Sequence, residues 1–189
     1  MEVAARKIAL RDQVLTARRR RPLLERQRAA EAISDRLLAW EPVRRAATVA
    51  AYASVGSEPP TGLLLDRLLA AGKRVVLPVL LPGGDLDWAV FTGDLVPARL
   101  GLLEPPGPRL GPEALATADV VLVPGVAVDR SGRRLGRGGG SYDRALGRVP
   151  VGTPVVVLLH DDEVLDEVPV AEHDRPVTAA VTPSALRSF

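Results

Sequence analysis

Four short runs of apolar residues give the sequence its main pattern. Strands buried on both faces of a sheet have such continuous runs, and these lie at residues 48–53, 74–79, 120–123 and 155–159. Between the first two runs, leucines recur at helical spacing on one face of residues 61–71, and Gly72 follows as a typical helix stop. This order predicts a right-handed strand–helix–strand unit with parallel strands.

The first forty residues predict two helices. In residues 7–19 the apolar positions are few and helically spaced, which indicates a helix lying on the body of the fold. Four consecutive arginines, residues 18–21, end at Pro22, and proline is tolerated in the first turn of a new helix. The second helix is expected to continue to about Trp40, with a buried stripe of Ala30, Ile33, Leu37 and Leu38.

The remaining segments complete one layered domain. Residues 88–91 and 177–181 are further candidate strands, and residues 112–118 predict a short helix. Residues 82–111 are rich in Pro and Gly with no helical period, so we expect them to meander over one edge of the sheet. The most economical fold is a single α/β sandwich of residues 1–189, in which helices flank a mostly parallel sheet.

Composition narrows the possible functions. The chain has 189 residues, no cysteine and a formal net charge of +2. The absence of cysteine excludes thiol catalysis, disulfides and cysteine-bound zinc. The charge is too small to indicate a nucleic-acid partner by itself. Charged residues precede any apolar run, and every run is well short of the roughly 18 residues of a membrane span, so we expect a cytoplasmic protein with no membrane partner.

Residues 119–146 give the strongest indication of chemistry. They read as a buried strand, a loop rich in Gly and Arg, and a helix that begins near Ser141. Glycines let a backbone approach a ligand closely and turn its N–H groups toward phosphate oxygens, while arginines hold phosphate with paired hydrogen bonds. Ligands of α/β sheets bind where such loops leave the carboxyl ends of strands. The predicted anion site comprises Arg133, Arg134, Gly136, Arg137, Gly138, Gly139 and Gly140.

Spacing excludes two common phosphate motifs. The nucleotide P-loop needs Gly-Lys-Ser or Gly-Lys-Thr, and the dinucleotide fingerprint needs a third glycine where Ser141 or Asp143 stands. A flexible glycine-rich surface loop is the simpler alternative. Asp143 argues against that alternative, because a carboxylate beside phosphate is repelled unless a cation such as Mg²⁺ lies between them.

Five ordered sequence elements resemble those of one enzyme family. The strongest is the run PGVAVD followed by RLGRGGG and Tyr-Asp-Arg, and the others are Lys7, Leu10 and Arg11, Glu58 within residues 52–61, the LGLLEP segment at 100–105, and Asp174 within 169–177. Together they resemble the 5-formyltetrahydrofolate cyclo-ligase family, whose members are also called methenyltetrahydrofolate synthetases. The resemblance extends over nearly the whole chain and implies an architecture related to sugar-phosphate isomerases and CoA transferases.

The resemblance implies an ATP- and Mg²⁺-dependent ligase that converts 5-formyltetrahydrofolate into 5,10-methenyltetrahydrofolate, ADP and phosphate. The formyl oxygen would attack the terminal phosphorus of ATP, and a neighbouring ring nitrogen would then displace phosphate. The resemblance also implies catalytic roles for Arg137 and Asp143 and Mg²⁺ ligation by Asp143 and Asp174. The implied ATP contacts are Lys7, Ile8, Ala9, Leu10, Arg11, Arg134, Leu135, Gly136, Arg137, Gly138, Gly139, Gly140, Ser141 and Tyr142. The implied folate contacts are Ala53, Glu58, Arg137, Gly138, Gly139, Gly140 and Ser141.

Several of these residues also have simpler interpretations. Lys7, Arg11 and Arg18 lie on about the same helix face, which suits a polyphosphate clamp and equally a solvated basic helix. Glu58 precedes two prolines and could be a turn residue. The two histidines, at positions 160 and 173, are given no catalytic role, because such histidines are more often structural or solvated.

Two positions depart from the family pattern. Ser141 and Val128 stand where family members commonly have aromatic residues, and the whole chain has only two Tyr, two Trp and two Phe. A ligase with a different small substrate, or an enzyme acting on sugar phosphates, therefore stays open. A non-catalytic protein that binds RNA or nucleotide through the 18–21 arginines is another alternative, although RNA is disfavoured because few aromatic residues are available for base stacking. ATP and reduced folate are the expected partners, and the oligomeric state is left open between monomer and dimer.

Overall fold

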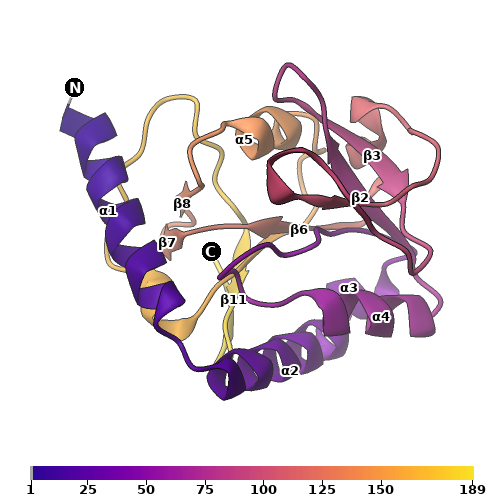
Figure 1. Ribbon diagram of the computed structural model, residues 1–189, viewed down its shortest axis with the longest axis horizontal. Helices are drawn as coiled ribbons and strands as arrows, with labels where there is room; N and C mark the ends of the chain where they lie inside the picture. The colour runs from indigo at the N-terminus through magenta and orange to yellow at the C-terminus, as the bar shows by residue number, and fades with distance from the viewer. Residues whose placement is uncertain (1) are drawn as a thin grey trace.

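The computed structural model describes residues 2–189 and is built around a seven-stranded sheet with the order β12-β11-β9-β6-β1-β2-β3 (Figure 1). The five inner strands run parallel, while β12 and β3 pair antiparallel at the two edges. The predicted parallel sheet is therefore confirmed, since the four apolar runs form β1, β2, β6 and β9. The strands are β1 (Thr48–Ala50), β2 (Arg74–Leu80), β3 (Leu86–Val90), β6 (Val120–Pro124), β9 (Val155–Leu158), β11 (Ala179–Val181) and β12 (Leu186–Ser188).

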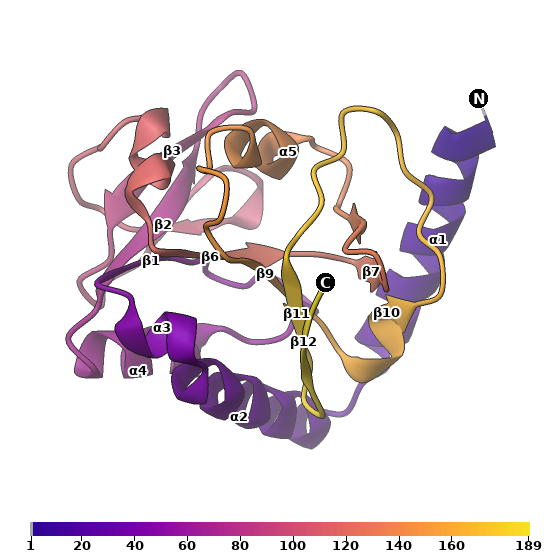
Figure 2. The same ribbon diagram turned by 180° about the vertical axis from the view of Figure 1, so that it is seen from behind.

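Helices cover both faces of this sheet, as Figures 1 and 2 show. Three helices, α2 (Leu23–Ala39), α3 (Glu41–Arg45) and α4 (Gly62–Ala70), pack on one face. The opposite face is covered by the short helix α5 (Ser141–Leu146) and the 3₁₀ helix η2 (Pro112–Thr117). Alternate residues of each strand point into the two cores, as in any pleated sheet, so both faces of the inner strands are apolar.

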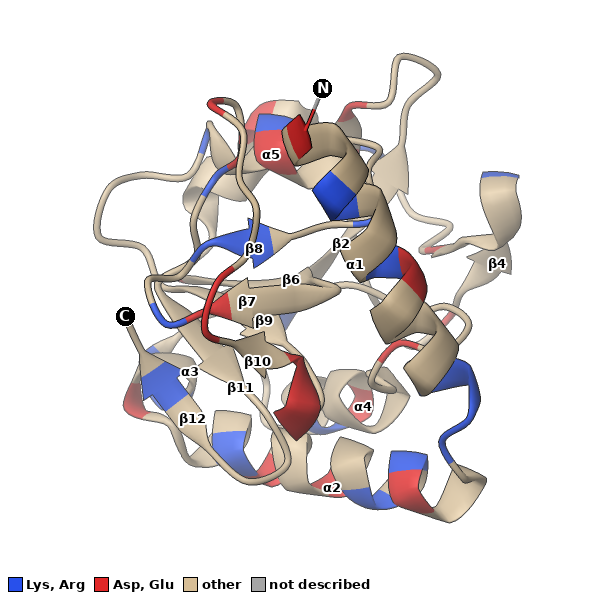
Figure 3. Ribbon diagram, turned by 90° about the vertical axis from the view of Figure 1, so that its left-hand side faces the viewer, with Lys and Arg blue, Asp and Glu red and all other residues tan. Residues whose placement is uncertain are grey.

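A smaller three-stranded sheet supports the N-terminal helix. Helix α1 (Glu2–Arg19) packs through Val14 onto a core that includes Val126, Leu135 and Val168. Figures 2 and 3 show α1 running beside this sheet, whose strand order is β10-β7-β8. Its strands are β7 (Ala127–Asp129), β8 (Arg134–Leu135) and β10 (Val164–Leu165), which follows the 3₁₀ helix η3 (Asp161–Glu163).

The structure differs from the sequence-based expectation mainly at element ends. Strand β1 stops at Ala50 rather than at residue 53, because the chain then leaves the sheet. Helix α3, the small sheet and β12 were not predicted. The candidate strand at residues 88–91 is confirmed as β3, which begins two residues earlier. The rest of residues 82–111, expected to be irregular, contains a hairpin of β4 (Val96–Pro97) and β5 (Leu103–Glu104) around the 3₁₀ turn η1 (Arg99–Gly101). Among residues 2–189, no helix combines the length and apolar character needed to cross a membrane.

Candidate functional site

A pocket of about 330 Å³ lies at the carboxyl ends of β1, β2 and β6, where α/β sheets usually bind ligands. The chain that follows β1 contributes Ala53 and Glu58, and the glycine-rich loop contributes Arg134 together with every residue from 136 to 143. Most residues on the polar side of this pocket are therefore ones that the sequence singled out. The structure adds an apolar side, formed by Pro78, Leu80, Leu86, Leu100, Leu102 and Leu103.

The glycine-rich loop has a backbone that other residues would not adopt readily. Gly138 and Gly140 have φ angles of +105° and +69°, in the range that favours glycine. At Gly136, an added Cβ atom would lie 2.9 Å from a guanidinium nitrogen of Arg134. These glycines therefore keep the loop close to its neighbours and leave its backbone open to the pocket.

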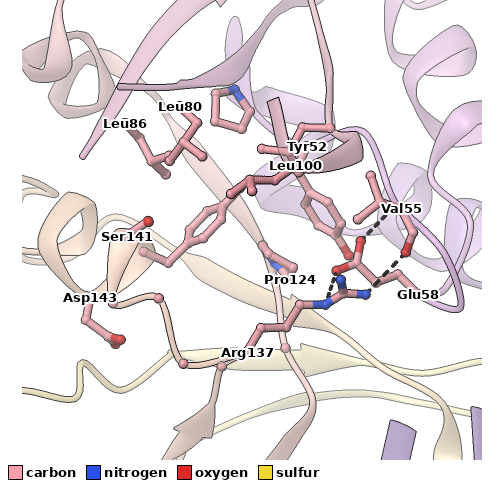
Figure 4. Close-up of a pocket in the computed structure, with 18 of the residues that line it drawn as sticks. Tyr52, Val55, Glu58, Leu80, Leu86, Leu100, Pro124, Arg137, Ser141 and Asp143 are labelled. Carbon is pink, nitrogen blue, oxygen red and sulfur yellow. Dashed lines mark hydrogen bonds and ion pairs between the residues drawn. The ribbon is translucent and has the colours of Figure 1, made fainter. Parts of the chain in front are cut away.

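Glu58 and Arg137 meet across the mouth of the pocket (Figure 4). Arg137 Nε lies 3.1 Å from Glu58 Oε1, and Arg137 Nη2 donates to the carbonyl oxygen of Val55 at 3.3 Å. The Glu58 side chain is only 5% exposed, whereas that of Arg137 is 46% exposed. Burial raises the pKa of Glu58, and the Val55 N–H and the Arg137 charge offset only part of this rise. Glu58 is thus a desolvated carboxylate with a half-exposed cationic partner.

Asp143 is held in place by two donors. Arg134 Nη2 donates to Asp143 Oδ1 at 2.9 Å, and the backbone N–H of Arg175 donates to the same oxygen at 3.1 Å. The Arg134 guanidinium is almost fully buried and also donates to the carbonyl oxygen of Pro124 at 3.1 Å. Arg134 therefore serves here mainly to orient Asp143.

Two tyrosines line the pocket with unsatisfied hydroxyl groups. Within residues 2–189, the buried hydroxyls of Tyr52 and Tyr142 have no hydrogen-bond partner. Burial raises the pKa of both phenols, and the nearby Glu58 charge raises it further, so both are neutral. Tyr142 was an expected site residue, but Tyr52 was missed because it lies within the apolar run 48–53, where an aromatic residue looks like core. A bound ligand would satisfy these hydroxyls.

Helix α1 contacts the glycine-rich loop from outside the pocket. Arg11 Nε donates to the carbonyl oxygen of Gly136 at 2.8 Å, and Lys7 forms an ion pair with Asp174. None of the implied ATP contacts on α1 lines the pocket itself, and the side chain of Ile8 points to solvent. The predicted shared face of Lys7 and Arg11 is confirmed, and it borders the loop.

Asp143 and Asp174 suit a magnesium ion to different degrees. Within residues 2–189, the hydrogen bonds to Asp143 end on Oδ1, which leaves Oδ2 for a cation. Asp174 Oδ2 already accepts from Lys7 and from the Ala171 N–H. Burial alone would raise the pKa of Asp174, but these two donors lower it overall. No group of three or more His, Cys, Asp or Glu side chains in the described residues is arranged to hold a metal ion. One or two carboxylates suit Mg²⁺, which usually completes its shell with phosphate oxygens and water.

Arg18 belongs neither to a polyphosphate clamp nor to a solvated basic helix face. Its side chain is fully buried and donates to both carboxylate oxygens of Glu163 at 2.6 Å and to the Gly125 carbonyl oxygen at 2.8 Å. Arg21, at the other end of the arginine run, is paired with Glu25 and Asp162. The run is therefore not a continuous basic surface, which removes the main support for RNA binding.

Other predicted residues lie away from the pocket. Arg133 is exposed and does not line it, and the Leu135 side chain packs in the core under α1. Val128 is buried in the core against the sheet and does not line the pocket. Of the two departures from the family pattern, only Ser141 lies at the pocket. His160 is buried, and burial lowers its pKa, which agrees with a structural role.

Comparison with known proteins identifies the family. Residues 3–183 match the 5-formyltetrahydrofolate cyclo-ligase family. The chain is 45% identical to a 5-formyltetrahydrofolate cyclo-ligase of Mycolicibacterium smegmatis over 94% of this chain and 93% of that protein, and 38% identical to the Escherichia coli enzyme over 89% and 96%. The 5,10-methenyltetrahydrofolate synthetase structure from Aquifex aeolicus has a TM-score of 0.83 at 30% identity and covers 96% of this chain and 92% of its own. Its counterpart from Mycoplasma pneumoniae, at 21% identity and a TM-score of 0.75 over 94% and 98%, shares the fold. The chain belongs to the 5-formyltetrahydrofolate cyclo-ligase family.

Proposed function

We propose that this pocket carries out the ATP-dependent cyclisation of 5-formyltetrahydrofolate to 5,10-methenyltetrahydrofolate, with release of ADP and phosphate. One observation carries the proposal. A single cavity has an apolar side and a buried carboxylate facing a loop of glycines and arginines. A planar heterocycle suits the first part, and a polyphosphate suits the second. The cytoplasmic location and the oligomeric state stay predictions from the sequence.

The folate half of the site is assigned to Glu58 and the apolar wall. A buried carboxylate accepts hydrogen bonds from ring N–H groups, and its interaction with them is strong because the surroundings exclude water. Ala53 lies beside it in the pocket, where a small side chain leaves room for a ring. Arg137 is half exposed, so it is free to leave Glu58 and turn toward phosphate when folate takes its place.

The nucleotide half is assigned to residues 136–142, with Arg11 and Lys7 behind them. The loop backbone offers N–H groups to phosphate oxygens, and Arg137 adds a planar cation that can bind phosphate with two hydrogen bonds. Arg11 fixes the loop by donating to the Gly136 carbonyl oxygen. Lys7 is paired with Asp174 and would pair with a phosphate of ATP instead when the nucleotide binds. The individual contacts of Ile8, Ala9, Leu10 and Leu135 stay predictions.

Asp143 and Asp174 are the residues proposed to hold Mg²⁺. They come from distant parts of the chain, yet the Arg175 N–H that follows Asp174 donates to Asp143, so the fold brings the two segments together. When bound, the ion would neutralise negative charge on the phosphates of ATP. Arg134 keeps Asp143 oriented for this task.

The chemistry needs positioning and charge neutralisation more than a protein nucleophile. The formyl oxygen attacks the terminal phosphorus of ATP, ADP leaves, and the ring nitrogen attacks the activated formyl carbon as phosphate departs. Arg137 is proposed to neutralise charge on the transferred phosphoryl group. The neutral phenol of Tyr142, buried beside the loop, is a donor available to an oxygen in the pocket.

The proposal is tested by a coupled assay on the purified protein. Methenyl product and ADP are followed with 5-formyltetrahydrofolate, ATP and Mg²⁺ present, and each is then omitted in turn. Product is expected only when all three are present. ATP binding without methenyl product would instead favour a different small substrate, and the absence of nucleotide binding would reopen the non-catalytic alternative.

Two arginines of the same loop give a matched comparison. Arg137→Ala is expected to lower kcat/KM about 100-fold or more, because it removes a cation aimed at developing charge. Arg133→Ala removes an exposed arginine that does not line the pocket, and it should leave kcat/KM within about twofold of wild type. Equal effects of the two changes would contradict the assigned role of Arg137.

A further inference from the structure

Leu100 has an unfavourable backbone conformation. It lies at the tip of the β4–β5 hairpin with φ 59° and ψ 25°, in the left-handed region that a Cβ atom disfavours. Among residues 2–189 it is the only residue other than glycine with a positive φ. Such strain persists only where the surroundings impose it, and it is concentrated at functional sites.

Its side chain is also unfavourably exposed. Leu100 is 84% exposed, more than any other leucine of the described chain, and yet it lines the pocket together with Leu102 and Leu103. In Figure 4 its side chain is drawn over the middle of the pocket, among the labelled lining residues. In the absence of a ligand, an exposed apolar side chain at the mouth of a pocket contributes nothing to the stability of the fold.

Hydrogen bonds fix the hairpin at its base. Glu104 Oε1 accepts from the Leu80 N–H at 2.9 Å, and the Ala98 N–H donates to the Leu102 carbonyl oxygen at 2.9 Å. Glu104 is buried, so its bond ties the hairpin to strand β2. The hairpin therefore presents Leu100 to the pocket in a definite position.

We propose that Leu100 is a substrate-contacting residue that covers an apolar face of the planar ring system of reduced folate. The proposal rests on the proposed function, in which folate occupies this pocket. Substrate binding would bury the exposed leucine and exclude water from that side of the ring. Because Leu100 faces the apolar side of the pocket and no phosphate-binding group, it contributes to folate affinity and leaves nucleotide affinity unchanged.

The test compares three variants by calorimetric titration. Leu100→Ala is expected to weaken 5-formyltetrahydrofolate binding about five- to tenfold, since it removes most of the apolar contact. Leu100→Gly is expected to weaken folate binding at least as much while the protein becomes no less stable, because glycine relieves the positive φ. Binding of a non-hydrolysable ATP analogue with Mg²⁺ should stay within about twofold of wild type in both. Leu23→Ala, which shortens an exposed leucine of α2 outside the pocket, is the control and should change neither affinity.

Two results would overturn the proposal. One is wild-type folate affinity in Leu100→Ala and Leu100→Gly, and the other is an equal loss of folate and nucleotide affinity. Calorimetry measures binding without turnover. If the wild-type protein binds folate but forms no methenyl product, the proposed function is wrong, and the folate affinities of the variants still test the role of Leu100.

Discussion

At the scale of single residues, the buried charge of Glu58 is proposed to bind the substrate and to lower the stability of the fold. Burial raises its pKa in the folded protein, so ionisation costs folding free energy as the pH rises from the ordinary carboxyl range through the raised pKa. Below the unfolded pKa this cost is absent. Glu58→Gln should therefore increase the free energy of unfolding at neutral pH, and the gain should shrink to nothing as the solution is acidified below about pH 4.

The same change should damage substrate binding. A charge-assisted hydrogen bond contributes roughly 1.5–3 kcal/mol, so Glu58→Gln is expected to raise the KM for 5-formyltetrahydrofolate at least about tenfold. Denaturant unfolding at several pH values and steady-state kinetics check the two effects. A variant that is less stable than wild type at neutral pH would contradict the assigned cost of the buried charge.

Ser141 lines the pocket at a position that the family resemblance assigns to an aromatic residue. Ser141→Tyr should tighten folate binding roughly fivefold, because an aromatic contact contributes about 1 kcal/mol beyond its buried area. Val128→Phe is the contrasting change. Val128 is fully buried in the core, so the larger side chain should cost roughly 1–3 kcal/mol of stability and leave folate affinity unchanged. Titration with folate measures the affinity of both variants, and denaturant unfolding measures their stability.

At the scale of elements, helix α1 is anchored by a buried ion pair. Arg18→Met leaves the Glu163 carboxylate buried without its cation and should cost about 3–5 kcal/mol of stability. Arg18→Met combined with Glu163→Leu removes both charges and should recover most of this loss. Arg19→Met, at an exposed neighbour, should stay within about 0.5 kcal/mol of wild type. Denaturant unfolding gives all three values, and a double variant as unstable as Arg18→Met would contradict this interpretation.

Sequence patterns predicted the long elements and missed those defined by distant partners. The runs of Val and Leu in the parallel strands report burial on both faces, and this property is local. Strands as short as β8 and β10 cannot show an alternation of apolar and polar residues along the sequence. They form only because β7 lies between them and pairs with both. Lys7 and Arg18 look like a solvated basic face because their acidic partners lie 167 and 145 positions away.

At the scale of the whole molecule, the site joins segments that sequence spacing does not connect. Motifs identified Glu58 and residues 136–143, because each contains a residue type with a specific chemical use. Their meeting across one cavity depends on the order of β1 and β6 in the sheet. Tyr52 and Leu100 lie in segments that resemble the family, but neither was assigned to the site, because an apolar or aromatic side chain carries no specific chemical signal. Their importance appears only from an unsatisfied hydroxyl and a strained backbone.

This assembly predicts separate stabilisation by the two substrates. At about 100 times its Kd, either 5-formyltetrahydrofolate or a non-hydrolysable ATP analogue with Mg²⁺ should add about 2.7 kcal/mol, which raises Tm by roughly 5–10 °C for a chain of this size. Lys7→Ala should lose most of the nucleotide shift and keep the folate shift, because Lys7 pairs with Asp174, which is proposed to hold Mg²⁺, and lies outside the pocket.

Thermal unfolding of each protein, with shifts taken from its own ligand-free Tm, makes the comparison independent of the lost Lys7–Asp174 pair. Arg6→Ala is the matched control, since Arg6 is an exposed neighbour on α1 that pairs with Glu167. It should keep both shifts. If Lys7→Ala reduces the folate and nucleotide shifts equally, α1 acts only by supporting the fold, and its place in the nucleotide site is wrong.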